Sequence, residues 1–473
     1  MEARSEPLLT IVEIIRATGG EVLALGNKGF VASVAVDSRE CSRDGLFVAL
    51  PGGRTDGHFF VEEAIRRGAS LFLVNRKFAQ ENKGKITLLA EKAHAGFIVV
   101  PDTLRALQDL ARFHMRKHAD VVRVGVTGSS GKTTTKDLIG SILKRGTSAF
   151  VSEGNLNSEI GLPLSAFRVQ KNDHYAVFEM GMNHPGEMDV LVDIVRPDLA
   201  AITNIGTAHI GLLGSRHAIA SEKKKIFALF DGPQTGFVFE EEPYFSFLKE
   251  GIRGSVLPYG PTTTPGYEGS DGLGIEGFEL RVRGRPMRLA LVGKHNLHNA
   301  LCAISVAEHL GVPLADVQEG LEAVRPNSGR GEVLRGRITV LQDSYNANPE
   351  SFAKAVDFLG DLPWEGRKVI VAGSMMELGH ESAEAHARVG ALLAGSTADA
   401  LFLFGAEAEA AYRKCEGCKP TVVWTTDFEE LKRAVLDFVR EGDVVLLKGS
   451  RSMALERLVP DLTDERRPLH EGG

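Results

Sequence analysis

The stretch of this 473-residue chain that is best suited to chemistry is "VTGSSGKTTTKD", residues 126–137. Its small residues let backbone N–H groups approach a phosphate, the ammonium of Lys132 can neutralise charge, and the Thr133 hydroxyl can bind Mg²⁺. A branched apolar run precedes it and a helical pattern follows, so the positive end of the helix faces the anion. The sequence therefore predicts a nucleoside triphosphate site formed by Gly128, Ser129, Ser130, Gly131, Lys132, Thr133 and Thr134.

This loop departs from the commonest phosphate-loop pattern, G-x-x-x-x-G-K-[ST], which would require glycine where the chain has Val126. The alternative interpretation is an ordinary glycine-rich turn between a strand and a helix, with an exposed lysine. The order of strand, glycine turn, G-K-T and helix favours the nucleotide site, because a triphosphate site requires that order.

Two ionisable residues lie in or just beyond other apolar runs. Glu179 interrupts "YAVFEMGM", and because a buried acid without a partner is costly, a nearby cation such as Mg²⁺ is a reasonable inference. Apart from the phosphate loop, a capped strand end explains it equally well. His209 in "ITNIGTAHIG" follows a strand end, where open α/β sheets bind ligands, although a structural histidine is the commoner case.

The segment "IASEKKKIFALF" has the pattern of an amphipathic helix and carries Lys223, Lys224 and Lys225 in succession. On charge pattern alone, the favoured interpretation is a solvated basic face. Under that interpretation none of the three lysines has a chemical role.

The elements that must position these residues form two series of strands. From Asp102 onward, apolar runs alternate with helix-period segments, which is the pattern of parallel α/β sheets. The first series comprises "VVRVGV", "YAVFEMGM" and "DLAAITNIG", and the second comprises "ITVLQDS", "KVIVAGS", "ALFLFG", "TVVWTT" and "DVVLLKGS". Two separate sheets are expected.

The remaining segments divide the chain into about three domains, the number that its length also suggests. Short strands such as "FVASVAV" and "GLFVAL" around one clear helix, "GHFFVEEAIRRGA", predict a small α+β module at the start. "LPYGPTTTPGYEGSDGLG" is expected to be a surface loop or irregular hairpin, and "VRPNSGRGE" a hinge. The predicted fold class is α/β, with an N-terminal α+β domain (1–100), a central phosphate-loop parallel sheet (101–327) and a C-terminal Rossmann-like domain (328–473).

Composition and charge narrow the class of protein. A formal net charge of -7 argues against a general binder of nucleic acid or anionic membranes, because such proteins carry a basic footprint. No apolar run approaches the roughly 18 residues that span a bilayer, and charges interrupt the N-terminal segment, so no membrane insertion is expected. Four cysteines in so long a chain do not make a disulfide framework. A monomeric cytoplasmic enzyme is expected.

The spacing of several motifs goes beyond these general patterns. "TGSSGKTTTKD" resembles the nucleotide loop of the Mur ligases, which also lacks the first Walker glycine. The resemblance continues in the family's order through "DSRECSRDGLFVALPGGRTDGHFFVEEAIRRGA", "SEGNLNSEIGLPLS", "FEMGMNHPGEM", "TNIGTAHI", "GKHNLHNALCAISVAEHLG", "DSYNANPES", "MMELGHES" and "LLKGSRSMALE". The loop therefore looks suited to ATP-driven amide bond formation.

The resemblance implies roles for the residues around ATP. Lys132 and Thr133 are implied to hold the ATP phosphates and Mg²⁺. Glu179 is implied to be a magnesium ligand, and His209 to serve a second metal site. Lys223 matches the family lysine that is carbamylated, which opposes the interpretation of a solvated basic face. The implied catalytic residues are thus Lys132, Glu179, His209 and Lys223, and the implied metal ligands are Thr133, Glu179, His209 and Lys223.

Further matches concern residues that contact ATP, the peptide of the acceptor and the uridine end of the acceptor. The residues implied to lie near the adenine or to close over ATP are His295, Asn296, Asn299, Arg330 and Asp343. The residues implied to contact the acceptor are Asn155 and Asn157, which face its muramoyl peptide, and Ser38 and Arg39, at its uridine end.

Within the family, "DSYNANP" together with "MELG" points to the ligase that adds D-alanyl-D-alanine to a UDP-N-acetylmuramoyl-tripeptide in peptidoglycan precursor synthesis. The implied reaction phosphorylates a tripeptide carboxylate with ATP, and the amine then displaces phosphate. One alternative is a sister ligase that adds diaminopimelate or lysine, for which "DNPR" is expected in the third domain and does not occur. The others are a folylpolyglutamate synthetase and an ATP-binding regulator that makes no bond.

Three departures from the family's pattern occur, one of which is Ser158 in "NLNSEIG", where a second asparagine is frequent. Residues 240–244, "EEEPY", stand where relatives often carry N-x-D-D-P, and Ser374 stands where an acid is usual. These departures leave details of the nucleotide and peptide contacts open, but they do not change the implied class of reaction.

Overall fold

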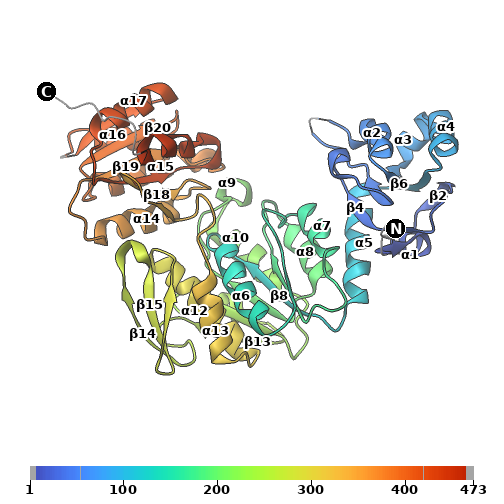
Figure 1. Ribbon diagram of the computed structural model, residues 1–473, viewed down its shortest axis with the longest axis horizontal. Helices are drawn as coiled ribbons and strands as arrows, with labels where there is room; N and C mark the ends of the chain where they lie inside the picture. Colours follow the sequence, from blue (N-terminus) through green and yellow to red (C-terminus); the bar gives the residue numbers. More distant parts are fainter. Residues whose placement is uncertain (1–6, 54, 419, 465–473) are drawn as a thin grey trace. The chain divides into compact units, whose positions relative to one another are not determined.

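The computed structural model describes residues 7–53, 55–418 and 420–464, and Figure 1 shows the order of their helices and strands. They form two compact units, which are treated separately. The first comprises the described residues up to Gly125 with Ser148–Met182 and Gly186–Asp198. The second comprises Val126–Thr147, Asn183–Pro185 and the described residues from Leu199 onward. Among the described residues, no helix is both long enough and apolar enough to cross a membrane.

The N-terminal part of the first unit is built on a five-stranded sheet in the order β2-β7-β6-β5-β4. Strand β2 is antiparallel to β7, and the other neighbours are parallel. The sheet buries Phe47, Phe72 and Phe97, and the last two rings stack with their centroids 4.9 Å apart. The strands are β2 Glu21–Ala24, β4 Ser33–Ala35, β5 Gly45–Val48, β6 Ala69–Asn75 and β7 Gly96–Val100; β1 Leu9–Thr10 and β3 Phe30–Val31 form a separate pair.

The prediction of one clear helix in this part was incomplete. The helices are α1 Ile11–Thr18, η1 Ser38–Glu40, η2 Gly57–Phe60, α2 Val61–Arg66, α3 Arg76–Glu81 and α4 Lys83–Ala93, of which the η elements are 3₁₀ helices. Helices α1 and α3 span only eight and six residues, and side-chain caps mark their starts. Thr10 and Glu13 form a capping box on α1, and the side chain of Asn75 accepts from the Phe78 N–H at 2.8 Å on α3.

The rest of the first unit supports the start of the central sheet. It contains α5 Thr103–Lys117, β9 Ala149–Val151, α7 Gly161–Ala166, β10 Tyr175–Glu179 and α8 Glu187–Val195. Helix α5 begins at Asp102, whose carboxylate accepts from two N–H groups of the first turn, and it packs against α7 and α8. Strands β9 and β10 are parallel, as expected for this part of the chain.

The burial of His114 on α5 makes the stability of the folded protein depend on pH. Its side chain is buried beside His118 and Phe167, and its Nε2 atom lies 3.0 Å from the carbonyl oxygen of Val169. Burial lowers the pKa of His114 from 6.5 to about 4, so the folded protein keeps the imidazole neutral where the unfolded chain protonates it. Its contribution to stability is therefore complete above about pH 6.5 and is lost as the pH falls towards 4.

When the pH falls from about 7 to 4.5, we expect the free energy of unfolding to decrease less in the His114→Gln variant than in the wild type. The difference between the two decreases should be about 2 kcal/mol. Glutamine can still donate to the Val169 carbonyl, and the other histidines are common to both proteins, so the difference reports His114. Urea unfolding at the two pH values measures the free energy of unfolding. An equal loss in both proteins would contradict the lowered pKa.

The second unit carries the phosphate loop and most of the central sheet, whose strand order is β13-β12-β11-β8-β10-β9. Strand β8 Val122–Thr127 belongs to the first unit up to Gly125, and the strands of this sheet that lie wholly in the second unit are β11 Leu199–Ile202, β12 Thr235–Phe239 and β13 Ser255–Tyr259. Every residue of β11 is buried, as in parallel sheets that are covered on both faces. The helices are α6 Lys132–Gly146, α9 Ile210–Leu213, α10 Arg216–Lys224, η3 Lys225–Phe227, α11 Phe245–Lys249, α12 Lys294–His309 and α13 Leu314–Ala323.

A small antiparallel sheet follows β13, in the order β14-β15-β16. Its strands are β14 Tyr267–Gly272, β15 Phe278–Val282 and β16 Arg285–Leu289, and the 3₁₀ helix η4 Gly274–Glu276 joins the first two. The expectation of a loop was wrong for β14, while that of an irregular hairpin holds, because the register shifts between Tyr267 and Gly269. The strand was hidden because its sequence, "YEGSDG", has low β propensity and depends on pairing with β15.

The C-terminal sheet confirms the second predicted series, in the order β17-β18-β22-β19-β20-β21. Strand β17 is antiparallel to β18 and the other neighbours are parallel. The strands are β17 Glu332–Leu334, β18 Thr339–Asp343, β19 Lys368–Gly373, β20 Ala400–Phe404, β21 Thr421–Thr425 and β22 Val444–Lys448. The helices are α14 Pro349–Asp361, η5 Gly379–Glu381, α15 Ser382–Ala394, α16 Glu409–Cys415, α17 Phe428–Phe438, η6 Arg451–Met453, η7 Leu455–Leu458 and α18 Val459–Thr463.

Candidate active site

The predicted phosphate loop lies between β8 and α6. Gly128 and Gly131 have φ angles of 149° and 80°, which favour glycine. Close contacts exclude a side chain as well: a Cβ on Gly128 would lie 1.8 Å from Thr203 Oγ1, and one on Gly131 would lie 2.6 Å from Asn299 Oδ1. Gly131 begins α6 without a side-chain cap, so the positive end of the helix dipole faces the loop. This arrangement suits a bound anion.

Two lysines converge on this loop. The Nζ atoms of Lys132 and Lys223 lie 2.9 and 3.0 Å from the same carbonyl oxygen, that of Gly128. Lys223 is only 1% exposed, and burial, together with the charge of Lys132, lowers its pKa well below the usual value for lysine. Such an amine loses its proton more readily and can then act as a nucleophile.

The interpretation of a solvated basic face is wrong for Lys223. Its two neighbours have other partners: Lys224 donates to the Phe247 carbonyl at 2.7 Å, and Lys225 forms an ion pair with Glu222 at 2.8 Å. Successive helical residues point about 100° apart, so one of three adjacent lysines can face the interior while the others do not. The pattern of charges along the sequence does not show which of the three lysines faces the interior.

Residues 203–209, which we call the 203–209 loop, support the phosphate loop. Asn204 Nδ2 donates to Ser130 Oγ at 2.9 Å, and the Gly206 N–H donates to Ser129 Oγ at 2.8 Å. The two serines of the phosphate loop are therefore held by hydrogen bonds from the protein itself.

His209 ends the 203–209 loop and caps α9 with a φ angle of 63°. Burial, followed by the charges of Lys132 and Lys223, lowers the pKa of His209 to about 4, so the imidazole is neutral at pH 7. Its Nδ1 atom lies 3.2 Å from Glu377 Oε2, without hydrogen-bond geometry. A neutral imidazole at this place can serve as a ligand.

Glu179 ends β10 in the first unit and is 3% exposed, which confirms its predicted burial. Its Oε1 atom accepts from Asn157 Nδ2 at 2.7 Å, and its N–H donates to Ser152 Oγ at 3.0 Å. The Asn157 N–H in turn donates to the Asn155 carbonyl at 2.8 Å. The structure thus brings the acid predicted to bind metal together with the asparagines predicted to face the peptide.

The predicted adenine segment begins α12. Asn296 Nδ2 donates to the Val292 carbonyl at 2.8 Å, and Asn299 Nδ2 donates to Asn296 Oδ1 at 3.1 Å. Asn299 also lies against Gly131, so this segment touches the phosphate loop. Burial lowers the pKa of His295 to about 4.

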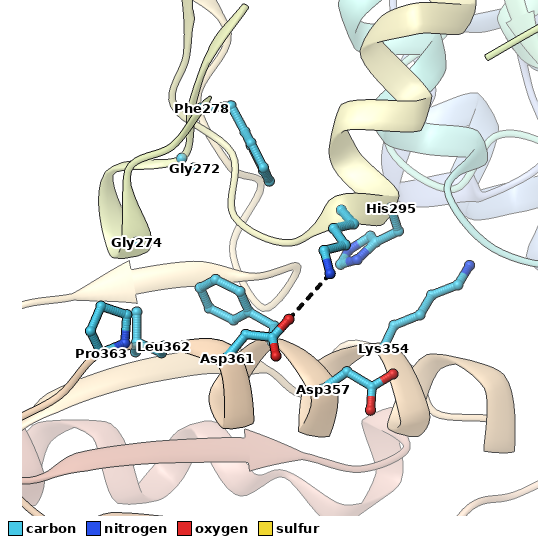
Figure 2. Close-up of a pocket in the computed structure, with 12 residues that line it drawn as sticks. Gly272, Gly274, Phe278, His295, Lys354, Asp357, Asp361, Leu362 and Pro363 are labelled. Atoms are coloured by element: carbon cyan, nitrogen blue, oxygen red, sulfur yellow. Dashed lines mark hydrogen bonds and ion pairs between the residues drawn. The ribbon is translucent and has the colours of Figure 1, made fainter. Parts of the chain in front are cut away.

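His295 also lines a cavity of about 290 Å³ between the β14–β15 hairpin, the start of α12 and the helix α14 (Figure 2). Its lining includes the apolar residues Phe278, Phe358, Leu362 and Pro363 and the charged residues Lys294, Lys354, Asp357 and Asp361. Two of these lining residues form an ion pair, with Lys294 Nζ 3.2 Å from Asp361 Oδ2. Asn296 and Asn299 are not part of the lining.

Arg330 and Asp343, predicted to close over the nucleotide, lie on segments that are joined by a hydrogen bond. The Tyr345 N–H donates to the Gly329 carbonyl at 3.0 Å, and the Arg330 guanidinium lies 3.8 Å from the centroid of the Tyr345 ring. Asp343 forms an ion pair with the buried Lys448, at 2.9 Å.

The two residues predicted at the uridine end differ in exposure. Ser38, on η1 of the first unit, is buried and donates to Glu63 Oε2 at 3.1 Å. Arg39 is paired with Asp37 at 2.5 Å, but its side chain remains 76% exposed. The Arg39 guanidinium is therefore the more accessible of the two groups for an anionic ligand.

The departures at residues 240–244 and at Ser374 have structural roles. In residues 240–244, Glu240 accepts from the hydroxyls of Thr262 and Thr263 at 2.8 and 2.6 Å. Glu242 is buried and accepts from the Ile205 N–H at 2.9 Å, which supports the 203–209 loop. Ser374 is fully buried and accepts from the Ala408 N–H at 3.2 Å inside the C-terminal sheet region.

Sequence reasoning missed three carboxylates around the 203–209 loop: Glu242, Glu350 and Glu377. Glu350 accepts from both the N–H and the hydroxyl of Thr207, at 3.0 and 2.8 Å. Glu350 lies in "DSYNANPES" and Glu377 lies in "MMELGHES", two of the segments that resemble the family. Their place in these segments was the only sequence signal that could have pointed to a role at the site. Their direction towards the loop depends on tertiary structure.

Comparisons with known proteins give matches along most of the chain. The models of the Mur ligase middle domain, the Mur ligase glutamate ligase domain and the Mur ligase family catalytic domain match residues 126–307, 329–451 and 31–115. A UDP-N-acetylmuramoyl-tripeptide--D-alanyl-D-alanine ligase of Treponema pallidum is 42% identical over 471 residues, covering 97% of this chain and 100% of that protein. The chain belongs to the Mur ligase family. A Mur ligase of the same name from Bacillus subtilis is 34% identical, with 92% and 93% covered.

Solved Mur ligase structures share the fold. A crystal structure of MurF from Acinetobacter baumannii has a TM-score of 0.87 at 30% identity, and the match covers 98% of this chain and 100% of that chain. The MurF ligase of Thermotoga maritima, solved in complex with ADP, has a TM-score of 0.77 at 28% identity, with 91% and 97% covered. These matches confirm the predicted α/β fold with N-terminal, central and C-terminal Mur ligase domains.

Proposed function

We propose that this protein is an ATP-dependent ligase that joins D-alanyl-D-alanine to a UDP-N-acetylmuramoyl-tripeptide. The observation that carries this proposal is the alignment with the Treponema pallidum ligase of that name over its whole length. The phosphate loop with its two converging lysines supports ATP as the driving substrate, as does the ADP bound to the Thermotoga maritima relative.

In the reaction that we propose, a carboxylate oxygen of the tripeptide attacks the γ-phosphorus of ATP, and ADP leaves. The amine of D-alanyl-D-alanine then attacks the acyl phosphate carbon, and phosphate and a proton are released as the amide forms. Phosphorylation turns a poor leaving group into a good one. The protein supplies positioning and charge neutralisation, to which Lys132 and the start of α6 contribute.

We further propose that Mg²⁺ is held by Thr133, Glu179, His209 and a carbamate on Lys223. An ammonium on Lys223 does not fit a cation site, because it is positive and lies beside Lys132. A carbamate does fit, because it is anionic and offers two oxygens. The lowered pKa of Lys223 supports this modification, since only the neutral amine adds CO₂. Bound Mg²⁺ supplies neutralisation of the phosphate charge.

For the remaining contacts we propose the division that the motifs imply. His295, Asn296 and Asn299 lie towards the adenine, and the mixed apolar and polar cavity beside His295 has room for a flat ring. Arg330 and Asp343 close over the nucleotide. Asn155 and Asn157 face the peptide, and Ser38 and Arg39 face the uridine end.

The domain boundaries that we propose are residues 1–100 for the acceptor, 101–327 for ATP and 328–473 for the C-terminal ligase domain. The matched ranges 31–115, 126–307 and 329–451 support this division. We place the protein in the cytoplasm, where ATP and a UDP-linked acceptor are both present, as a monomer without a nucleic-acid partner.

Phosphate release that depends on both substrates tests the proposed function. We expect turnover only when ATP, D-alanyl-D-alanine and a UDP-N-acetylmuramoyl-tripeptide are all present, and tripeptides ending in lysine or in diaminopimelate are assayed in parallel. Turnover with free diaminopimelate or lysine on the shorter acceptor would indicate the sister ligase, and turnover with glutamate on a folate would indicate the folylpolyglutamate synthetase. Nucleotide binding without acceptor-stimulated hydrolysis would indicate the regulator.

A further inference from the structure

Glu350 occupies a rigid position at the start of α14. The helix begins with a capping box formed by Asn348 and Ser351, and Pro349 fills its first turn. From this position both carboxylate oxygens of Glu350 bind Thr207: Oε1 accepts from the N–H at 3.0 Å, and Oε2 accepts from the hydroxyl at 2.8 Å. A residue of the C-terminal sheet region thus binds a loop of the central sheet at two points.

The backbone between Thr207 and the phosphate loop leaves little room for a side chain. A Cβ on Gly206 would lie 3.3 Å from both Glu350 Cδ and Ser129 Cβ, so Gly206 is enclosed by the phosphate loop and by α14. The N–H of Gly206 donates to Ser129, and the next N–H, that of Thr207, donates to Glu350. Movement of Glu350 would therefore shift Thr207 and the adjacent Gly206 N–H, which donates to Ser129.

The same contact reaches His209. The Ile210 N–H donates to the Thr207 carbonyl at 3.1 Å, and this bond closes the turn in which His209 has its φ angle of 63°. If the Glu350 carboxylate is removed, Thr207, the first residue of this turn, loses the acceptor of its N–H and its hydroxyl. Glu350 thus supports, through Thr207, a loop that contacts the phosphate loop and ends at His209.

We propose that Glu350 is a positioning residue for the ligation reaction, which holds the 203–209 loop against the phosphate loop. The kinetic effect of this residue rests on the proposed function, whereas its contact with the 203–209 loop does not. Because Glu350 reaches the phosphate loop only through Thr207 and Gly206, its loss should lower kcat by a larger factor than it raises the KM for ATP.

Hydrogen exchange of the full-length protein without ligands tests the contact. In Glu350→Ala we expect the amides of residues 205–210 to exchange about 10- to 100-fold faster, the range expected when a hydrogen bond to a charged group is lost. The matched control is Glu384→Ala, because Glu384 is also a carboxylate in the first turn of a C-terminal helix but is 76% exposed and paired with Arg388. Unchanged protection of this loop in Glu350→Ala would overturn the proposal.

Kinetics test the positioning role. We expect kcat to fall about 10- to 100-fold in Glu350→Ala, with a smaller rise in the KM for ATP. Glu350→Gln should recover much of the activity, because its amide oxygen can accept from the Thr207 N–H while its NH₂ group donates to the hydroxyl. A normal kcat in Glu350→Ala, or a fall that appears only in KM, would overturn the role. If the wild type itself shows no substrate-dependent turnover, the proposed function fails and the exchange result alone decides the contact.

Discussion

Replacement of Lys132 by alanine is expected to abolish amide ligation while leaving the fold intact. The Lys132 ammonium lies at the phosphate loop, 2.9 Å from the Gly128 carbonyl, where it can neutralise the charge that develops on the transferring phosphate. A preorganised charge of this kind contributes at least about 100-fold to kcat. The rate of phosphate release with all three substrates measures the effect.

A control on the same helix separates this effect from a general loss of positive charge. Lys144 is an exposed residue in the last turn of α6, so Lys144→Ala changes the net charge equally but at the far end of the helix. We expect Lys144→Ala to retain nearly normal turnover, and urea unfolding should show both variants folded. Near-normal turnover in Lys132→Ala would end the assignment of the phosphate loop.

Lys223→Ala is expected to show the second largest loss, by about 100-fold or more, because the proposed carbamate would be absent. The removed side chain is 1% exposed, so its loss leaves an enclosed space next to the Gly128 carbonyl. Small carboxylic acids such as acetate should partly restore activity by placing oxygens where the carbamate had them. Lys223→Arg should not be rescued, because the guanidinium keeps both bulk and charge.

The adjacent lysines provide matched controls. Lys224→Ala removes a bond to the Phe247 carbonyl, and Lys225→Ala removes an ion pair with Glu222, and neither side chain reaches the phosphate loop carbonyl that Lys223 contacts. Both variants should therefore lose little activity. A nearly normal Lys223→Ala, or a greater loss in Lys224→Ala, would show that the proposed carbamate is misplaced.

Much of the fold could be predicted because many of its strands are short apolar runs. Residues of "KVIVAG" and "ALFLF" are almost all buried in the C-terminal sheet, and such runs are evident without knowledge of their neighbours. The missed elements carried other signals. Helix α1 begins at a capping box that is local in the sequence, whereas β14 depends on its pairing with β15.

The phosphate loop was determined by the sequence itself, because its glycines, lysine, hydroxyl and helix start are contiguous and their chemistry depends on local backbone geometry. The burial of Lys223 and the direction of Glu350 were decided only by tertiary structure. Lys223 is 95 residues from the Gly128 carbonyl that it contacts, and Glu350 is 143 residues from Thr207. Burial and hydrogen bonding across such separations arise only when the chain packs, so residue type and spacing alone could not distinguish these side chains from solvated ones.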